Sequence, residues 1–269
     1  AWLILLTAAW LPTAVWGQEA KANAKQPLAA ALQEVFDRPP YKHAHWGVLV
    51  VDQQSGDVVY EHQHYRNIAN ASAAAWAYAL TGERRYADFA AKVLLGYADR
   101  YLKYPYHANT RNNLAWKVIS GGHLFEQTLN EAASLASDIA PAYDLIHDAL
   151  SEADRAAIRD GLLVPMLKNM DKHKAGKGNW QTWHNAGMIA GGAVLGDVAW
   201  VEKAIAQPHN GFVEQMKVSV SDDGMWYENS WGYHFYTLHA MVAIAEGARR
   251  LGLDLWTTPR FKASCSRWA

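Results

Sequence analysis

The sequence predicts a mainly α-helical fold: an incomplete (α/α) toroid of helical hairpins, preceded by a small N-terminal β-hairpin. Three observations support this prediction. A β-type alternation of apolar residues is confined to residues 46–60, helical periodicity begins near Ile68, and short Gly, Pro and Asn signals separate the helical segments. Helices joined by short turns in antiparallel order form stacked hairpins, which favours a toroid over a four-helix bundle.

Residues 1–17, AWLILLTAAWLPTAVWG, form an apolar run that resembles a secretory signal peptide with its start missing. This predicts a periplasmic or secreted protein with no membrane span in the mature chain. Residues 18–67 are expected to form a linker and a hairpin, because Ser55-Gly56-Asp57 supplies turn chemistry between two alternating runs. No later segment is expected to provide partner strands. His62 and His64, at the end of the hairpin, lack the rest of a zinc motif.

Residues 68–263 are expected to form the toroid. Ser151 and Asp154 open one helix in the manner of a capping box, and either Asn229 or Ser230 is expected to cap the last predicted helix. The expected helices lie near residues 69–80, 84–102, 122–147, 151–171, 180–195, 198–207, 211–219 and 230–251.

Composition limits the classes of ligand. The 25 basic and 26 acidic residues leave a net charge of -1, so no overall field favours nucleic acid or an anionic membrane, and an anionic ligand needs a local site. The 13 Trp and 13 Tyr residues suit stacking on sugar rings as well as core packing. A single cysteine, Cys265, excludes an internal disulfide.

The segment GNWQTWHNAG, residues 178–187, opens a predicted helix with polar and aromatic side chains. Trp180 and His184 are four residues apart and share one face. Free N–H groups and the helix dipole favour a carboxylate at such an N-terminus. Asn179 could be only a cap and His184 only a core residue, but the density of polar and aromatic residues favours a functional site. Small residues that let a neighbouring helix approach follow at positions 186, 187, 190 and 191.

The segment SDDGMWYENSWGYHFY, residues 221–236, places a turn before an aromatic helix. Tyr233 and Tyr236 are about one turn apart, and His239 follows after another turn. A tyrosine can accept and donate a proton when neighbouring groups lower its pKa. Most of these aromatic side chains are expected to serve packing, and one or two of the tyrosines are candidates for catalysis.

The segment GGHLFEQTLNE, residues 121–131, interleaves polar and apolar residues at helical spacing. This pattern predicts a helix with one side facing water or substrate, although that side could also be ordinary surface. The candidate sugar contacts in the whole chain are Gln127, Tyr143, Asn179, Trp180, Glu228 and His239.

Together these segments resemble the alginate lyase and heparinase II/III-like polysaccharide lyases over residues 68–263. The pieces that carry the resemblance are ALTGERRYADFAAKVLLGYADRY, QTLNEAASLASDIAPAYDLI, NWQTWHNAG and SDDGMWYENSWGYHFYTLHA. The resemblance implies an enzyme that cleaves a uronic-acid-containing, alginate-like polysaccharide by β-elimination. It implies an acidic polysaccharide as partner, and neither a cofactor nor a metal ion.

The resemblance also implies roles for individual residues. In such lyases an Asn or His pair neutralises the uronate carboxylate, and a Tyr or His removes the C5 proton and protonates the leaving oxygen at C4. By position, His184 and Asn185 resemble the neutralising and base-assisting residues, with Asn179 as the alternative. Tyr233 resembles the catalytic Tyr, with Tyr236 close behind. Donors aimed at the developing dianion stabilise it, and removing one typically costs about 10²- to 10³-fold in rate.

Both ends of the chain depart from this resemblance. Residues 40–67 resemble the opening of a penicillin-binding D-alanyl-D-alanine carboxypeptidase, but its Ser-x-x-Lys motif is absent, because Ala75 stands three positions after Ser72. Peptidase chemistry is therefore not expected. A joined or misassembled gene, with a boundary near residues 67–71, is the expected origin of this segment. Residues 264–269 do not continue the lyase pattern. Lyases of this type continue with more of the toroid and a β-sheet domain, so an open cleft is expected and activity of the chain by itself is left open.

Two other functions are compatible with the sequence. A non-catalytic carbohydrate-binding helical scaffold would bind uronate oligomers without turnover, and Trp180→Ala would abolish that binding. A glycoside hydrolase on the same fold would need two carboxylates about 5 to 10 Å apart. The polymer, internal or terminal cleavage, and the oligomeric state are left open. The candidate carboxylates for hydrolysis are Glu126, Asp144, Asp223 and Glu228.

Overall fold

A computed structural model describes residues 30, 34–35, 48–51, 58–62, 64–109, 120–125 and 127–266. The predicted signal segment, most of the predicted linker and Glu126 lie outside the described residues. The chain divides into two compact units, residues 1–67 and 68–269. Within the described residues, no helix is both long and apolar enough to cross a bilayer.

The first unit contains the predicted hairpin. Strand β1 (Val48–Val51) pairs antiparallel with β2 (Val58–His62), with Val50 opposite Tyr60. The register shifts between Val50 and Val51. Valine-rich runs of this kind favour extended backbone because their branched side chains fit a pleated surface.

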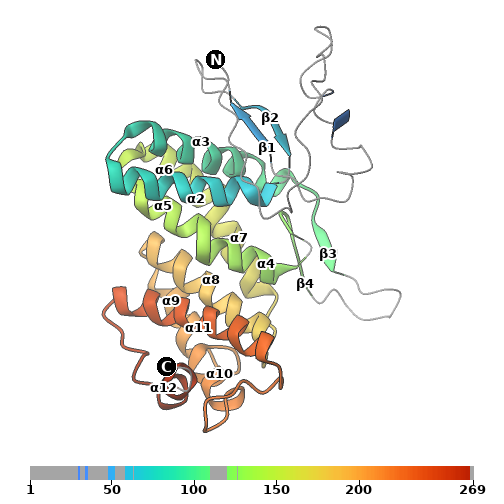
Figure 1. Cartoon of the computed structure of the whole chain (residues 1–269), viewed down its shortest axis with the longest axis vertical. Helices are drawn as coiled ribbons and strands as arrows, with labels where there is room; N and C mark the ends of the chain where they lie inside the picture. Colours follow the sequence, from blue (N-terminus) through green and yellow to red (C-terminus); the bar gives the residue numbers. More distant parts are fainter. Residues whose placement is uncertain are drawn as a thin grey trace, which may run out of the picture. The chain divides into compact units, whose positions relative to one another are not determined.

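The second unit is built from helices, which confirms the prediction of a mainly helical fold (Figure 1). π-helical turns at 135–139 and 159–163 join α4 to α5 and α6 to α7, so both pairs run as nearly continuous helices. The helices are α2 (His64–Thr81), α3 (Arg84–Arg100), α4 (Thr128–Ser134), α5 (Ala140–Ile146), α6 (Glu152–Ile158), α7 (Val164–Lys172), α8 (Asn179–Leu195), α9 (Val198–Ala206), α10 (Phe212–Val218), α11 (Trp231–Arg250) and α12 (Pro259–Ser266).

One expectation about secondary structure was wrong, and one helix was missed. The helix expected from Gly122 begins at Thr128, because residues 120–122 form strand β4 (Ser120–Gly122), paired antiparallel with β3 (His107–Asn109). The strands were missed because two paired segments of three residues give too little alternation to detect. Helix α12 was not expected at all, although Pro259 at its start is a common first residue of a helix.

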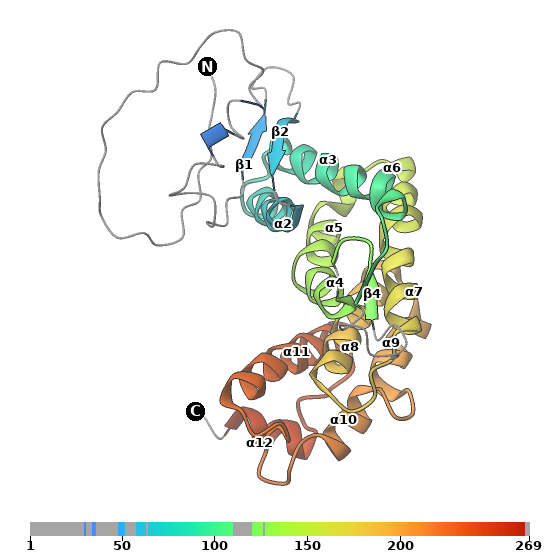
Figure 2. The same cartoon turned by 90° about the vertical axis from the view of Figure 1, so that its right-hand side faces the viewer.

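Helix α8 packs against α4, α7, α9 and α11 (Figures 1 and 2). Its glycines make this close packing possible. A Cβ atom on Gly187 would lie 3.1 Å from Cα of Ala132 on α4 and 2.8 Å from Sδ of Met170 on α7. A Cβ on Gly191 would lie 2.9 Å from a methyl group of Leu167. The prediction that small residues of this helix let its neighbours approach is therefore confirmed.

This packing predicts that Gly187→Leu destabilises the fold. Overpacking a tight core typically costs about 1 to 3 kcal/mol, and here part of the obstruction is backbone, which cannot rotate away. We expect the thermal midpoint, followed by circular dichroism, to fall by several degrees. The control is Gly96→Ala on α3, where a new Cβ meets only the flexible Arg100 side chain at 3.5 Å and the midpoint should hold or rise. An unchanged midpoint in Gly187→Leu would contradict the packing.

Candidate active site

The first turn of α8 is tied to the loop that precedes α11. The amide of Asn179, the first residue of α8, donates a hydrogen bond to Oε2 of Glu228 at 2.9 Å. The indole N–H of Trp226 donates to the same oxygen at 2.6 Å. Because one carboxylate receives both bonds, it fixes the Asn179 amide beside the loop that leads into the aromatic helix.

Aromatic contacts join the two helices further along. The ring of Trp183 on α8 lies 5.2 Å from the ring of Tyr236 and 5.3 Å from the ring of His239, centroid to centroid. The structure therefore brings the two predicted motifs together. Burial raises the pKa of Tyr236, which keeps its phenol protonated at neutral pH.

Tyr233 is the more accessible of the two candidate tyrosines. Half of its surface is exposed, against 37% for Tyr236. The side chain of Ser230 caps α11 by accepting a hydrogen bond from the backbone N–H of Tyr233, so the phenol extends from the first turn of the helix. Of the two cap candidates, the structure selects Ser230, while Asn229 adopts a positive φ of 51° just before it.

His184 and Asn185 are both completely buried. Neither ring nitrogen of His184 has a hydrogen-bond partner among the described residues. Burial, with a smaller contribution from nearby His173, lowers the pKa of His184 to about 3, so the ring is neutral at physiological pH. The Asn185 amide accepts from Gln181 at 2.9 Å and donates to the Asn210 carbonyl at 2.8 Å. In this geometry neither side chain meets solvent, and their catalytic roles stay predictions.

Of the predicted sugar contacts, Trp180 is partly buried on the first turn of α8. Gln127, also partly buried, directly precedes α4. Its backbone carbonyl accepts a hydrogen bond from the backbone N–H of Asn130 at 2.9 Å. Asn130 is exposed, whereas Glu131 beside it is fully buried. The polar residues expected on one side of this helix therefore do not share one environment: Asn130 faces water and Glu131 lies in the core.

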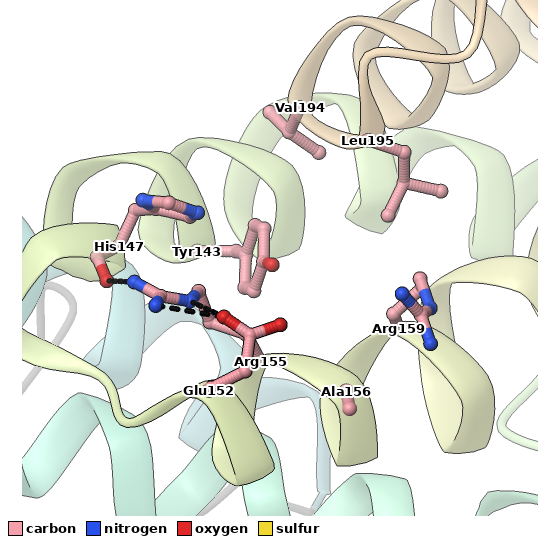
Figure 3. Close-up of a pocket in the computed structure, with 8 residues that line it drawn as sticks. All are labelled: Tyr143, His147, Glu152, Arg155, Ala156, Arg159, Val194 and Leu195. Atoms are coloured by element: carbon pink, nitrogen blue, oxygen red, sulfur yellow. Dashed lines mark hydrogen bonds and ion pairs between the residues drawn. The ribbon is translucent and has the colours of Figure 1, made fainter.

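Tyr143 lies elsewhere, in a pocket of about 320 Å³ that also includes Arg155 and Arg159 (Figure 3). Leu195 at the C-terminal end of α8 lines the same pocket. A helix of this length spans roughly 25 Å, so the pocket is far from Asn179 at the other end of α8. Both arginines are already paired with carboxylates. The structure therefore does not bring Tyr143 together with the other candidate residues.

Sequence reasoning missed a buried polar network around Glu131. Its carboxylate accepts hydrogen bonds from the Tyr101 hydroxyl at 2.8 Å, the Asn169 amide at 3.0 Å and the Leu124 backbone N–H at 2.8 Å. Burial raises the pKa of Tyr101, which keeps that phenol a hydrogen-bond donor. The acidic residue in helix 128–134, beside the apolar Leu129 and Ala132, was the available signal, but its partners are distant in sequence. In the part of the chain that the structure describes, no group of three or more His, Cys, Asp or Glu residues could hold a metal ion.

Comparisons with known proteins agree on one family. The model of the alginate lyase family matches residues 16–264. An alginate lyase of Stenotrophomonas maltophilia (strain K279a) is 32% identical over 259 residues, which cover 92% of this chain and 33% of that protein. An exo-oligoalginate lyase of Saccharophagus degradans is 31% identical over 209 residues, which cover 74% of this chain and 27% of that protein.

The chain therefore spans about a third of the length of the curated relatives it matches. The family match includes residues 40–67, so the similarity begins well before the expected boundary near residue 68. The resemblance of that segment to a carboxypeptidase is not addressed by these comparisons and stays a prediction.

Proposed function

Because the chain belongs to the alginate lyase family, we propose that it forms the helical catalytic layer of an enzyme that cleaves a uronic-acid-containing, alginate-like polysaccharide by β-elimination. The family match across residues 16–264 is the observation that carries the proposal. Both of these relatives are named as lyases, which favours elimination over glycoside hydrolysis and over a non-catalytic scaffold. The proposal includes an acidic polysaccharide as substrate and a periplasmic or secreted location.

We also propose that the helical unit is an incomplete (α/α) toroid. The support is the arrangement of its helices: α8 packs on α7 and α9, its neighbours in the chain, and also on α4 and α11 (Figure 2). Successive helices that pack on one another in this way are what stacked hairpins require.

In the proposed mechanism, the uronate carboxylate lies at the first turn of α8. A C5 proton beside an ionised carboxylate is weakly acidic, so donors must stabilise the dianion that develops when the proton leaves. Asn179 retains slight exposure at 6%, whereas His184 and Asn185 have none. One N–H of the Asn179 amide binds Glu228, which leaves a second N–H for the carboxylate. Among the positions implied by the resemblance, this geometry favours Asn179.

Tyr233 is the proposed proton-transfer residue. Its phenol is half exposed and extends from the first turn of α11, beside the loop that Glu228 ties to Asn179. When the C5 proton is removed, the electron pair of the C5–H bond forms the C4–C5 double bond, and the bond from C4 to the linking oxygen breaks. The leaving oxygen must then receive a proton, which a phenol can supply.

The test is a screen of uronate polymers with the purified chain. We expect alginate to yield an unsaturated sugar that absorbs near the ultraviolet edge, while a neutral polymer, which lacks the acidified C5 proton, yields none. New reducing ends without this absorbance would support hydrolysis and overturn the proposal. Binding of uronate oligomers without any product would leave the non-catalytic scaffold as the better account.

A further inference from the structure

Tyr106 lies outside the three segments that the sequence singled out, and its hydroxyl is within hydrogen-bond distance of a histidine ring. The Tyr106 hydroxyl lies 3.0 Å from Nε2 of His173 and 3.3 Å from Oδ1 of Asn169. His173 is 9% exposed, and its other ring nitrogen, Nδ1, lies 2.9 Å from the backbone carbonyl of Asn169. The Asn169 amide also reaches the buried Glu131 carboxylate at 3.0 Å. The four side chains therefore form one connected network.

The hydrogen-bond partners fix the protonation pattern of the pair. A carbonyl oxygen can only accept, so Nδ1 of His173 carries the ring proton. In a neutral ring Nε2 then has a free electron pair, so Nε2 and Oδ1 of Asn169 are both acceptors for the single proton of the Tyr106 hydroxyl. Tyr106 is 39% exposed, so a ligand can reach this residue from solvent. A phenol within hydrogen-bond distance of a neutral imidazole nitrogen can pass its proton to that nitrogen while its oxygen takes up another.

The pair is connected to the first turn of α8. His173 directly follows α7, and residues 174–178 lead from it to Asn179. Several hydrogen bonds hold this loop in place: among them, the Ala175 N–H donates to the Gln181 side chain at 2.7 Å, and Gln215 donates to the Gly176 carbonyl at 2.7 Å. The same short loop therefore links the pair to the proposed carboxylate position.

Burial, with the nearby Glu131 carboxylate, raises the pKa of Tyr106, so its phenol is protonated at neutral pH and can act as a base only if its own proton passes to a neighbour. The Lys172 ammonium lies 5.8 Å from the centroid of the Tyr106 ring, within the range of a cation–π contact. The Glu131 carboxylate is joined to the pair through the Asn169 amide. The ring of His123 packs on Tyr106 at 5.3 Å and limits its movement.

We propose that Tyr106 is a catalytic residue of the elimination, with His173 as its positioning and proton-accepting partner; this inference rests on the proposed function. The phenolic oxygen of Tyr106 takes the C5 proton while its own proton passes to Nε2 of His173. The electron pair of the C5–H bond forms the C4–C5 double bond, and the C4–oxygen bond breaks. Tyr233 gives its proton to the leaving oxygen, and transfer of a proton from His173 to Tyr233 through solvent restores both groups.

The test compares Tyr106→Phe, His173→Gln and the double variant on alginate, with unsaturated product as the readout. We expect each single variant to lower kcat by about 10²-fold or more while KM changes little, because the ring of residue 106 stays and only the proton path is lost. Residues that act as one unit are not additive, so the double variant should be no slower than the slower single variant. Tyr86→Phe, on α3, is the matched control and should retain wild-type kcat.

Three outcomes separate the possibilities. An active wild type with an equally active Tyr106→Phe overturns the role of Tyr106 and leaves the proposed function standing. Effects of the two single variants that multiply in the double variant overturn the coupling to His173. A wild-type chain without product on any uronate polymer rejects the proposed function and this inference with it. Thermal midpoints check folding, and if Tyr106→Phe does not fold, His173→Gln carries the same comparison.

Discussion

Tyr233→Phe is expected to lower kcat on alginate by about 10²- to 10⁴-fold, the range typical for loss of a general acid or base. The variant keeps the aromatic ring and removes only the phenolic oxygen. Tyr233 is half exposed, and the α11 cap bond uses its backbone N–H and the Ser230 side chain, so the substitution leaves the fold in place. We therefore expect an unchanged thermal midpoint and a KM close to that of wild type. The readout is the initial rate of unsaturated product at saturating and limiting alginate.

The matched control removes a phenol from another part of the helical unit. Tyr86 lies on α3, and its hydroxyl accepts a hydrogen bond from Arg85 at 3.1 Å. Tyr86→Phe should change neither kcat nor KM. If Tyr233→Phe turned over alginate as fast as this control, Tyr233 would have no part in proton transfer. The proposal would then need a different proton donor for the leaving oxygen, and Tyr236 would be the next candidate.

Local signals explain how much of the fold could be predicted. Helix α9 begins after Asp197, whose carboxylate accepts from the Ala199 N–H, and α8 ends at Gly196 in the left-handed conformation. Both are short-range effects of the residue type on its own backbone, so they can be recognised in the sequence. The β3–β4 pair depends instead on contacts between short segments that are separated along the chain, and no local pattern predicted it.

The same distinction applies to the candidate site: contacts between neighbours in the sequence could be predicted, and contacts between distant residues could not. Contacts within a motif, such as the cap of α11 by Ser230, follow from neighbours in the sequence. The bond between Asn179 and Glu228 joins residues 49 positions apart, and the pair of Tyr106 and His173 joins residues 67 positions apart. Such pairs depend on how the helices stack. A single sequence therefore identifies candidate residues but does not show which of them contact one another.

The sequence left the burial of His184 open as one of two alternatives, for a related reason. Its helix carries polar residues close to small ones, and helical spacing alone does not say which side faces a neighbouring helix. In the structure α8 is enclosed by α4, α7, α9 and α11, so positions on several of its sides are buried. The histidine of a motif rich in polar and aromatic residues therefore lies in the core.

That histidine gives the largest effect expected on stability. In the unfolded chain a histidine has a pKa near 6.5, whereas burial lowers the pKa of His184 to about 3 in the folded protein. Between these values the unfolded state binds the proton and the folded state does not, so the free energy of unfolding falls as pH falls. The contribution is complete above about pH 6.5 and is lost towards pH 3, at about 1.4 kcal/mol per pH unit.

His184→Leu should remove this dependence. At neutral pH we expect the variant to be as stable as wild type or more so, because it no longer buries two ring nitrogens that lack partners among the described residues. At about pH 4.5 it should be more stable than wild type by roughly 2 to 3 kcal/mol, measured as free energies of unfolding in urea. His209→Asn is the control: His209 is exposed at a positive φ of 67°, which Asn tolerates, so the acid slope should match wild type. Parallel slopes for wild type and His184→Leu would mean that His184 gains a proton in the folded state after all, and would return it to consideration as a cation for the uronate carboxylate.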